Sequence, residues 1–146
     1  MEQVSYTEDG HIYTDRASFI YGLLCPLKNE VRYIGASVNP VARYRAHLVP
    51  SEVRRTGVGG NISAKAAWIL RLAEEGVKPK LVILEEVAGH CETVGKQHPL
   101  VKEAEERWIV KLVRGGHKLT NSQMPAELEN DDKIFQEALE RGRELF

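Results

Sequence analysis

Cysteine is scarce in this chain, and long apolar runs are missing from it. The 146 residues include two cysteines, Cys25 and Cys91, which lie far apart and form no closely spaced pair. A small secreted fold held together by disulfides is therefore not expected. The opening residues, MEQVSYTEDG, lack the apolar segment of a signal peptide or membrane span. We expect a cytoplasmic protein of one domain that has no membrane partner.

A large excess of either charge is also missing, since the net charge is −1. The charges are nevertheless unevenly distributed. Residues 31–73 carry seven basic side chains and one acidic one, which gives +6, whereas residues 126–146 carry seven acidic and three basic ones, which gives −4. The basic part predicts a surface that faces a phosphate backbone, and the alternative is chance clustering on a solvated surface. Its cations are Arg32, Arg43, Arg45, Arg54, Arg55, Lys65 and Arg71.

The segment from residue 18 to residue 48 organises the rest of the chain. Two runs rich in apolar and aromatic residues, 18–25 and 31–37, flank the turn-forming PLKNE, which predicts an antiparallel hairpin. Tyr21 and Tyr33 would then lie on paired strands, within reach of each other. Asn39 and Pro40 together form a typical helix start. In that helix Arg43 and His47 are four residues apart, so they share a face.

The remaining elements are predicted from apolar spacing and from residues that begin or end helices. We expect a helix at 61–76, a central strand at 80–87, a helix at 99–114 and an acidic helix at 132–145. Residues 1–17 are interpreted as a polar lead-in with a short extra strand at 11–13. Residues 88–99 are interpreted as a turn-rich loop. Its His90, Cys91 and His98 match no zinc-site spacing, so these are interpreted as loop residues.

Glu105 is the acidic residue that fits the pattern least well. In the helix at 99–114 the apolar stripe consists of Val101, Ala104, Trp108 and Leu112, and Glu105 falls within it. A carboxylate on an apolar face is costly unless it is paired or bound to a metal. An ion pair with a buried arginine is one interpretation, and a metal ligand is the other.

The motif residues resemble, in content and spacing, the core of the GIY-YIG nucleases. They are Ile20, Tyr21, Tyr33, Ile34, Gly35, Ser37, Arg43 and His47. One departure is that Phe19 stands where the family usually has its first glycine. The resemblance spans about residues 19–121. It implies a three-stranded antiparallel sheet flanked by helices, with a nuclease domain at 18–122 and an acidic C-terminal helix at 123–146 packed on the same domain.

The resemblance also implies an activity, a metal-dependent endonuclease that hydrolyses DNA phosphodiester bonds. The implied catalytic residues are Tyr21, Tyr33, Arg43, His47, Glu105 and Asn121, and Glu105 would hold Mg²⁺ or Mn²⁺. Tyr21 is our choice as general base and Tyr33 as the group that orients water or phosphate, although the two roles can be exchanged. His47 would bind phosphate or shuttle a proton. Asn121 would support the metal end of the site, and a simple turn residue is the alternative.

The predicted DNA contacts extend beyond the catalytic residues. They are Gly35, Ser37, Arg45, Arg54, Arg55 and Lys65. A lysine at the margin of an apolar helix face, as Lys65 is, more often extends to water. Cutting both strands of a duplex would need a homodimer or a partner protein. The competing hypothesis is a nucleic-acid-binding module that has this fold and does not cleave.

Overall fold

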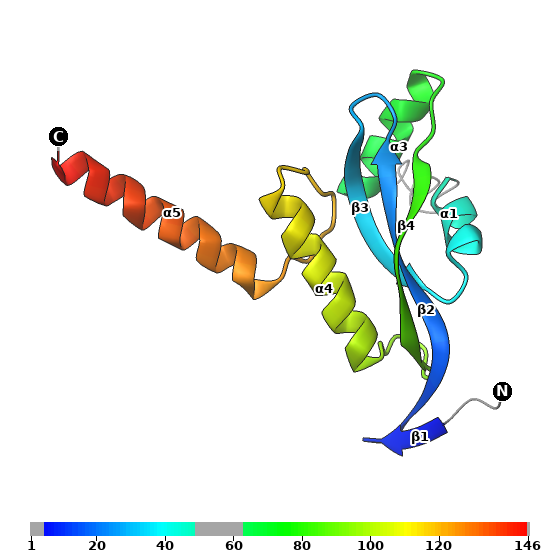
Figure 1. Ribbon diagram of the computed structural model, residues 1–146. Helices are drawn as coiled ribbons and strands as arrows, with labels where there is room; N and C mark the ends of the chain where they lie inside the picture. The colour runs from blue at the N-terminus through cyan, green and yellow to red at the C-terminus, as the bar shows by residue number, and fades with distance from the viewer. Residues whose placement is uncertain (1–4, 49–62, 146) are drawn as a thin grey trace, which may run out of the picture.

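The structure is a computed structural model that describes residues 5–48 and 63–145. It contains an antiparallel sheet with the strands β1 (Ser5–Glu8), β2 (His11–Cys25), β3 (Glu30–Ser37) and β4 (Lys80–Cys91). The helices are α1 (Pro40–Leu48), α3 (Ala64–Glu74), α4 (Pro99–Arg114) and α5 (Ala126–Leu145), as Figure 1 shows. The fold is therefore of the mixed α+β class.

Strand β2 is the centre of the sheet. β4 pairs along one edge of β2, whereas β1 pairs with the start of its other edge and β3 with the end of that same edge. The predicted hairpin is confirmed, and its register places Tyr21 opposite Gly35 and Leu23 opposite Tyr33. The predicted start of α1 is confirmed as well, because the Oδ1 of Asn39 accepts a hydrogen bond from the amide of Ala42 at 3.2 Å.

The sheet is larger than the predicted three-stranded one. β1 and β2 are joined by a turn at Asp9 and Gly10, which both have positive φ. Residues 5–8 and 11–17 form strands and not a polar lead-in, and the short extra strand predicted at 11–13 is present as the start of β2. The predicted domain start at residue 18 therefore falls inside β2. Residues 88–91 were predicted to be a loop, but they continue β4 and pair with β2. Cross-strand pairing of this kind overrides the weak local signal of a short polar segment.

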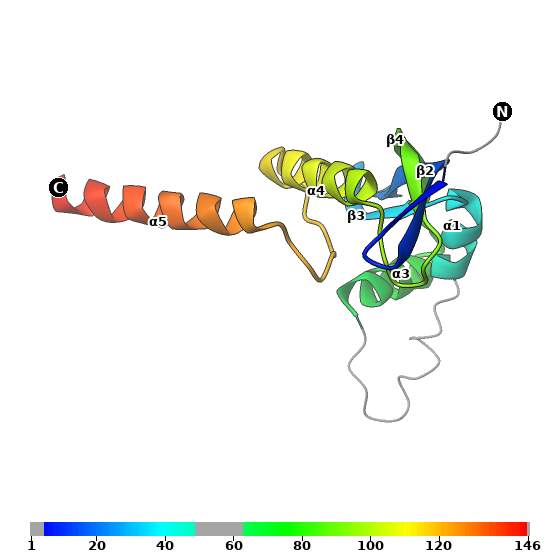
Figure 2. The ribbon, with the colours of Figure 1, turned by 90° about the horizontal axis from the view of Figure 1, so that it is seen from below.

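Helices cover both faces of the sheet. Figure 2 shows α4 on one face and α1 and α3 on the other. Side chains alternate along β2, so Ile20 packs in the cluster beneath α4 and Tyr21 packs in the cluster beneath α3. The buried residues on the α4 side are Ile20, Val31, Ile34, Val87, Val101, Ala104, Ile109, Val110 and Leu128.

Helix α5 begins at Ala126, six residues before the predicted start, and extends away from the sheet in Figures 1 and 2. Its first turns contact α4, since Leu128 is buried and the Nε of Arg114 donates to Asp131 at 2.7 Å. Within the described residues, the predicted packing of 123–146 on the domain is limited to this start. None of the helices in the described part of the chain is long and apolar enough to cross a bilayer.

Candidate active site

Two tyrosines and a histidine form an aromatic cluster on the face of the sheet that α1 and α3 cover. The hydroxyl of Tyr21 shares a hydrogen bond of 2.8 Å with the Nε2 of His47. The ring of Tyr33 lies 6.4 Å from that of Tyr21 and 5.2 Å, edge-on, from that of His47. β2, β3 and α1 each supply one member. Arg43, also on α1, acts on Tyr21 by charge and hydrogen bonding, so the structure brings together four of the six predicted catalytic residues.

Gly35 makes room for this cluster. A Cβ atom built on Gly35 would lie 2.5 Å from the hydroxyl oxygen of Tyr21, because the Tyr21 ring crosses directly over its cross-strand partner. Gly35 is itself buried. The prediction that Gly35 contacts nucleic acid is therefore not supported by its position. Its role is to let the phenol reach His47.

Tyr21 is enclosed and keeps its proton. Only 1% of its surface is exposed. Burial raises the pKa of Tyr21 well above its usual value, and the electrostatic effect of the neighbouring Tyr33 phenol raises it further. The charge and hydrogen bonding of Arg43 lower this pKa without offsetting burial, and the charge of Glu105 raises it. Tyr21 is therefore a neutral hydrogen-bonding group at physiological pH, which does not suit its predicted role as general base.

Tyr33 has the more open position of the two phenols. It is half-buried and lines a cavity of about 340 Å³ together with Lys65, Thr120 and Asn121. The ammonium of Lys65 lies 5.1 Å from the centre of the Tyr33 ring. A cation over an aromatic face is attracted by it. Lys65 thus faces the aromatic cluster instead of extending into bulk water, and a substrate group that enters this cavity would meet both side chains.

Asn121 holds the outer edge of β3. Its Oδ1 accepts from the amide of Ile34 at 3.0 Å, and its Nδ2 donates to the Ile34 carbonyl at 2.8 Å. The neighbouring Thr120 donates from its amide and its hydroxyl to the carbonyl of Arg32. These bonds dock the segment after α4 against the strand that carries Tyr33. Asn121 is more than a turn residue, and its geometry is that of a support for the site.

Glu105 lies on α4, at a second cavity of about 220 Å³ that it shares with Gln97, Lys102 and Gln123. Gln97 donates to its Oε2 at 2.7 Å, and in the described residues no lysine or arginine forms an ion pair with it. Burial raises the pKa of the Glu105 carboxyl, whereas the bond from Gln97 lowers it. The ion-pair interpretation of this residue is therefore not supported by the described contacts.

The groups around Glu105 are of a kind that suits a hard divalent ion. Mg²⁺ binds through one or two carboxylates and keeps several waters. A half-buried carboxylate beside a small polar cavity fits that preference. No group of three or more metal-ligating side chains occurs within residues 5–48 and 63–145. Glu105 would therefore be the main protein ligand, and water or substrate oxygens would fill the other positions.

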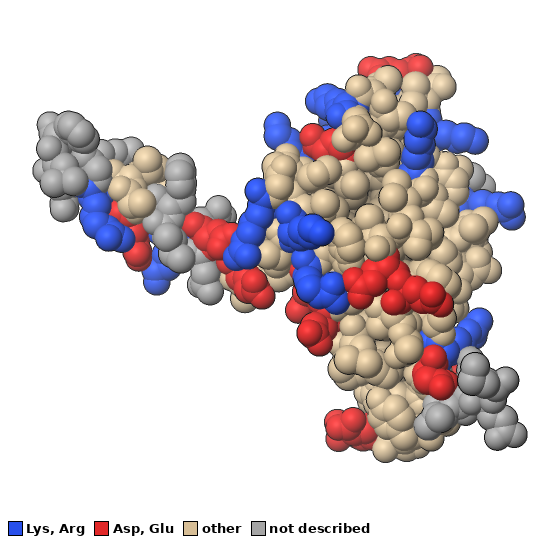
Figure 3. All heavy atoms as spheres, in the orientation of Figure 1, with Lys and Arg blue, Asp and Glu red and all other residues tan. Residues whose placement is uncertain are grey.

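Only some of the residues predicted to contact nucleic acid lie in positions that suit such contact. Arg43 and Arg45 are exposed on α1, whereas Ser37 accepts a hydrogen bond from the amide of Asn39 at 3.0 Å. Arg54 and Arg55 lie outside the described residues. On the face shown in Figure 3, basic and acidic side chains alternate over the surface of the described residues and form no single basic patch.

Two histidines are buried and hydrogen-bonded. His47 is only 3% exposed, so direct phosphate binding does not fit its position. The Nδ1 of His98 accepts from the amide of Leu100, and its Nε2 bonds to the hydroxyl of Tyr6. Sequence reasoning missed Gln97 as the partner of Glu105. Its only signal is the repeated four-residue spacing of Gln97, Val101 and Glu105.

Comparison of the chain with family models, with curated proteins and with solved structures gives no match. The function is therefore argued from the geometry of the site and from the motif residues.

Proposed function

We propose that the protein is a metal-dependent endonuclease of the GIY-YIG type that hydrolyses phosphodiester bonds in DNA. The main support is the placement of Tyr33. Its ring lies against His47 on one side and beneath Lys65 on another, at the wall of a cavity that also contains Asn121. A phenol, a cation and an open cavity in one place suit attack by water on a phosphate.

Tyr33 is the better general base, so we exchange the roles predicted for the two phenols. A base must come within hydrogen-bond reach of the proton that it removes. Tyr33 lines the cavity, whereas Tyr21 is enclosed and bonded to His47. Tyr21 and His47 then hold the Tyr33 ring in place. His47 can also take up a proton from the aromatic cluster and pass it on.

The cations bind the substrate backbone. Arg43 is exposed on α1, and its charge reaches Tyr21. Its planar guanidinium can donate two parallel hydrogen bonds to a phosphate. Lys65, whose ammonium lies over the Tyr33 ring, neutralises charge at the same cavity. Together they hold a phosphate where Tyr33 can act on an approaching water.

Glu105 would hold Mg²⁺ or Mn²⁺ at the α4 side of the site. When bound, the ion supplies Lewis-acid stabilisation of the charge that develops on the phosphate. Glu105 would provide the negative charge that attracts the ion, and its Oε2 accepts a hydrogen bond from Gln97. Asn121 keeps the segment between the two cavities docked on β3.

The second candidate is a nucleic-acid-binding module that does not cleave. It is favoured by one observation, namely that the cavity of Glu105 and the cavity of Tyr33 have no lining residue in common. The two candidates make the same prediction for binding and opposite predictions for turnover.

The deciding experiment incubates purified protein with supercoiled, branched and single-stranded DNA in Mg²⁺, in Mn²⁺ and in EDTA. We expect cleavage with either ion and none in EDTA. Tyr33→Phe should reduce the rate by about 10²- to 10⁴-fold, the usual contribution of a general base. Glu105→Gln should abolish cleavage while DNA binding persists. Tyr44→Phe is the control, because the Tyr44 hydroxyl bonds to the Pro79 carbonyl and lies outside the aromatic cluster.

DNA binding without cleavage under all these conditions would establish the non-cleaving module instead. Full activity of Tyr33→Phe would show that the phenol is not the base.

A further inference from the structure

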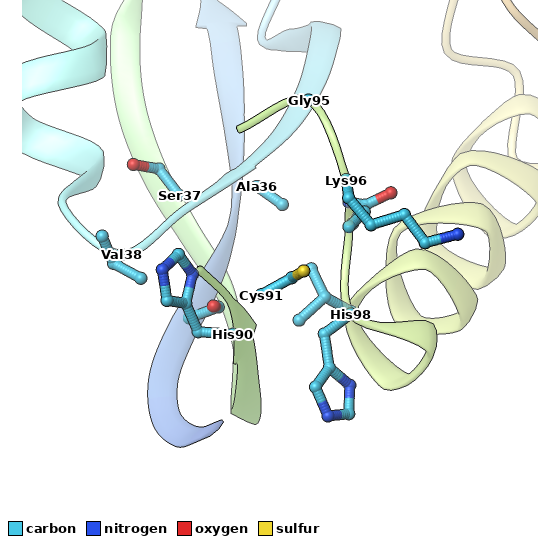
Figure 4. A pocket seen from close by; sticks show the side chains of 11 residues that line it. Ala36, Ser37, Val38, His90, Cys91, Gly95, Lys96 and His98 are labelled. Atoms are coloured by element: carbon cyan, nitrogen blue, oxygen red, sulfur yellow. The ribbon is translucent and has the colours of Figure 1, made fainter. Parts of the chain in front are cut away.

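Gln97 lies in the wall between two cavities. It lines the Glu105 cavity and also the larger cavity of about 360 Å³ in Figure 4, which the ends of β3 and β4 border. The segment that contains Gly95 and Lys96 runs beside the first turns of α4 in that figure. This return path brings Gln97 alongside a residue eight positions further on. Its amide donates to the Oε2 of Glu105 at 2.7 Å.

The position of Gln97 is fixed by the residue that follows it. His98 is 5% exposed and caps α4, with its Nδ1 accepting from the amide of Leu100 at 3.1 Å. Its ring crosses over Gly89 of β4, where a Cβ atom would lie 2.9 Å from Nδ1. Its Nε2 bonds to the hydroxyl of Tyr6 at 3.1 Å. His98 is thus tied to the sheet and to the helix at once, and it fixes the start of α4 directly after Gln97.

A carboxylate at the end of a flexible side chain needs such a partner. Glu105 has two oxygens that only accept hydrogen bonds when ionised, and a glutamine amide can offer it two N–H donors. Among the described contacts, the bond from Gln97 is the one made to this carboxylate, and it engages Oε2. The other oxygen, Oε1, therefore remains available to a cation.

We propose that Gln97 is the positioning residue of Glu105, holding its carboxylate so that Oε1 faces the cavity and can bind a divalent metal ion. This inference rests on the proposed function, in which Glu105 is the metal ligand. Hydrogen bonds to a metal-ligating group set its orientation, and their loss typically reduces metal affinity by about 10- to 100-fold. The same loss is expected here, because among the described contacts Glu105 forms no ion pair that would hold the carboxylate in addition to this bond.

The test is a calorimetric titration of the full chain with MnCl₂, in the absence of DNA. Gln97→Met keeps the length of the side chain and removes the donor, and it should weaken Mn²⁺ binding by about 10- to 100-fold. Gln97→Leu repeats the change with a different shape. Gln123→Leu is the matched control, since Gln123 lines the same cavity but forms no hydrogen bond with Glu105 among the described contacts. Thermal unfolding of each variant verifies that it is folded.

The outcomes separate this inference from the proposed function. If the wild type binds Mn²⁺, Glu105→Gln does not, and both Gln97 variants bind like the wild type, then Gln97 has no positioning role although Glu105 is the ligand. If Gln123→Leu loses as much affinity as Gln97→Met, the effect belongs to the cavity and the inference is overturned. If Glu105→Gln binds Mn²⁺ as well as the wild type, the assignment of Glu105 itself fails.

Discussion

The two faces of the sheet are built from the same strands and have different chemistry. On the α4 face, Ile20 and Ile34 are fully buried among aliphatic side chains. On the α1 and α3 face, the equally buried Tyr21 carries a hydroxyl that must be hydrogen-bonded, and His47 accommodates it. Both faces therefore supply packing free energy, and the α1 and α3 face additionally buries a hydrogen-bonded polar pair that packing alone would not favour. Consecutive residues on β2 therefore have different roles: Ile20 packs among aliphatic side chains, whereas Tyr21 carries the hydrogen-bonded hydroxyl.

Truncating the aliphatic face should have the largest effect on stability. Ile34→Ala removes a fully buried side chain and should lower the free energy of unfolding by about 2–5 kcal/mol. The aromatic cluster on the other face is left in place, so the cleavage rate of the folded fraction should fall far less than in Tyr33→Phe, although Ile34 packs against α4, the helix that carries Glu105. Urea unfolding and a cleavage assay measure the two quantities.

Ile83→Ala serves as the control, since Ile83 is on β4 and 49% exposed. It should change stability by no more than about 0.5 kcal/mol. A loss of cleavage in Ile34→Ala comparable to that expected for Tyr33→Phe would mean that the two faces are not separable.

A single methyl group should disturb the polar face. In Gly35→Ala the new Cβ would collide with the Tyr21 ring, and relieving such overpacking typically costs about 1–3 kcal/mol. We expect the displaced ring to weaken its bond to His47, so cleavage should fall together with stability. Gly76→Ala is a useful contrast, because its Cβ would meet no atom within 4 Å, although its positive φ adds strain of a purely backbone kind. Unchanged cleavage in Gly35→Ala would separate the Tyr21–His47 bond from function.

The smallest effect concerns the buried phenol and depends on pH. Burial raises the pKa of Tyr21 in the folded protein, whereas tyrosines in the unfolded chain ionise near their usual value of about 10. Above that pH the unfolded state binds fewer protons, so stability falls as pH rises. Tyr21→Phe should cost about 1 kcal/mol at neutral pH, the typical net value of a hydrogen bond.

The same variant should then lose less stability than the wild type between roughly pH 9 and 11, because it lacks the group that resists ionisation. Thermal unfolding across that range gives the comparison. Parallel pH profiles for the two proteins would contradict the assignment of Tyr21 as an enclosed, neutral phenol.

Local patterns in the sequence were sufficient to predict the hairpin and the helix start that carry the motif residues. The hairpin, the Asn39 cap and the pairing of Tyr21 with its neighbours follow from turn residues and alternation, which act over short distances. The strand character of residues 88–91 was missed because it depends on pairing with Tyr13 and Thr14, distant in the chain. The burial of His47 was missed for the same reason, since its hydrogen bond to Tyr21, on a distant strand, offsets the cost of burying the polar ring.

Roles within the site were harder to predict than its membership. The sequence places two tyrosines on facing strands but does not indicate which phenol is enclosed. That depends on how α1 lies over β2 and on the space left by Gly35. The partner of Glu105 depends on the path of a loop whose anchor, His98, crosses over a glycine of another strand. The first relation leaves no signal in the sequence, and the second leaves only the four-residue spacing of Gln97, Val101 and Glu105.

The segment from His117 to Asn121 has a consequence for how the molecule behaves at high concentration. β3 lies at the margin of the sheet, and this segment hydrogen-bonds to the backbone of Val31, Arg32 and Ile34 through both side chains and main chain. An uncovered margin would be a template for strands of other molecules, which is a common route to aggregation. The amide of Asn121 occupies the donor and the acceptor that an incoming strand would need. The side chain that supports the site thus also keeps neighbouring molecules from joining the sheet at that point.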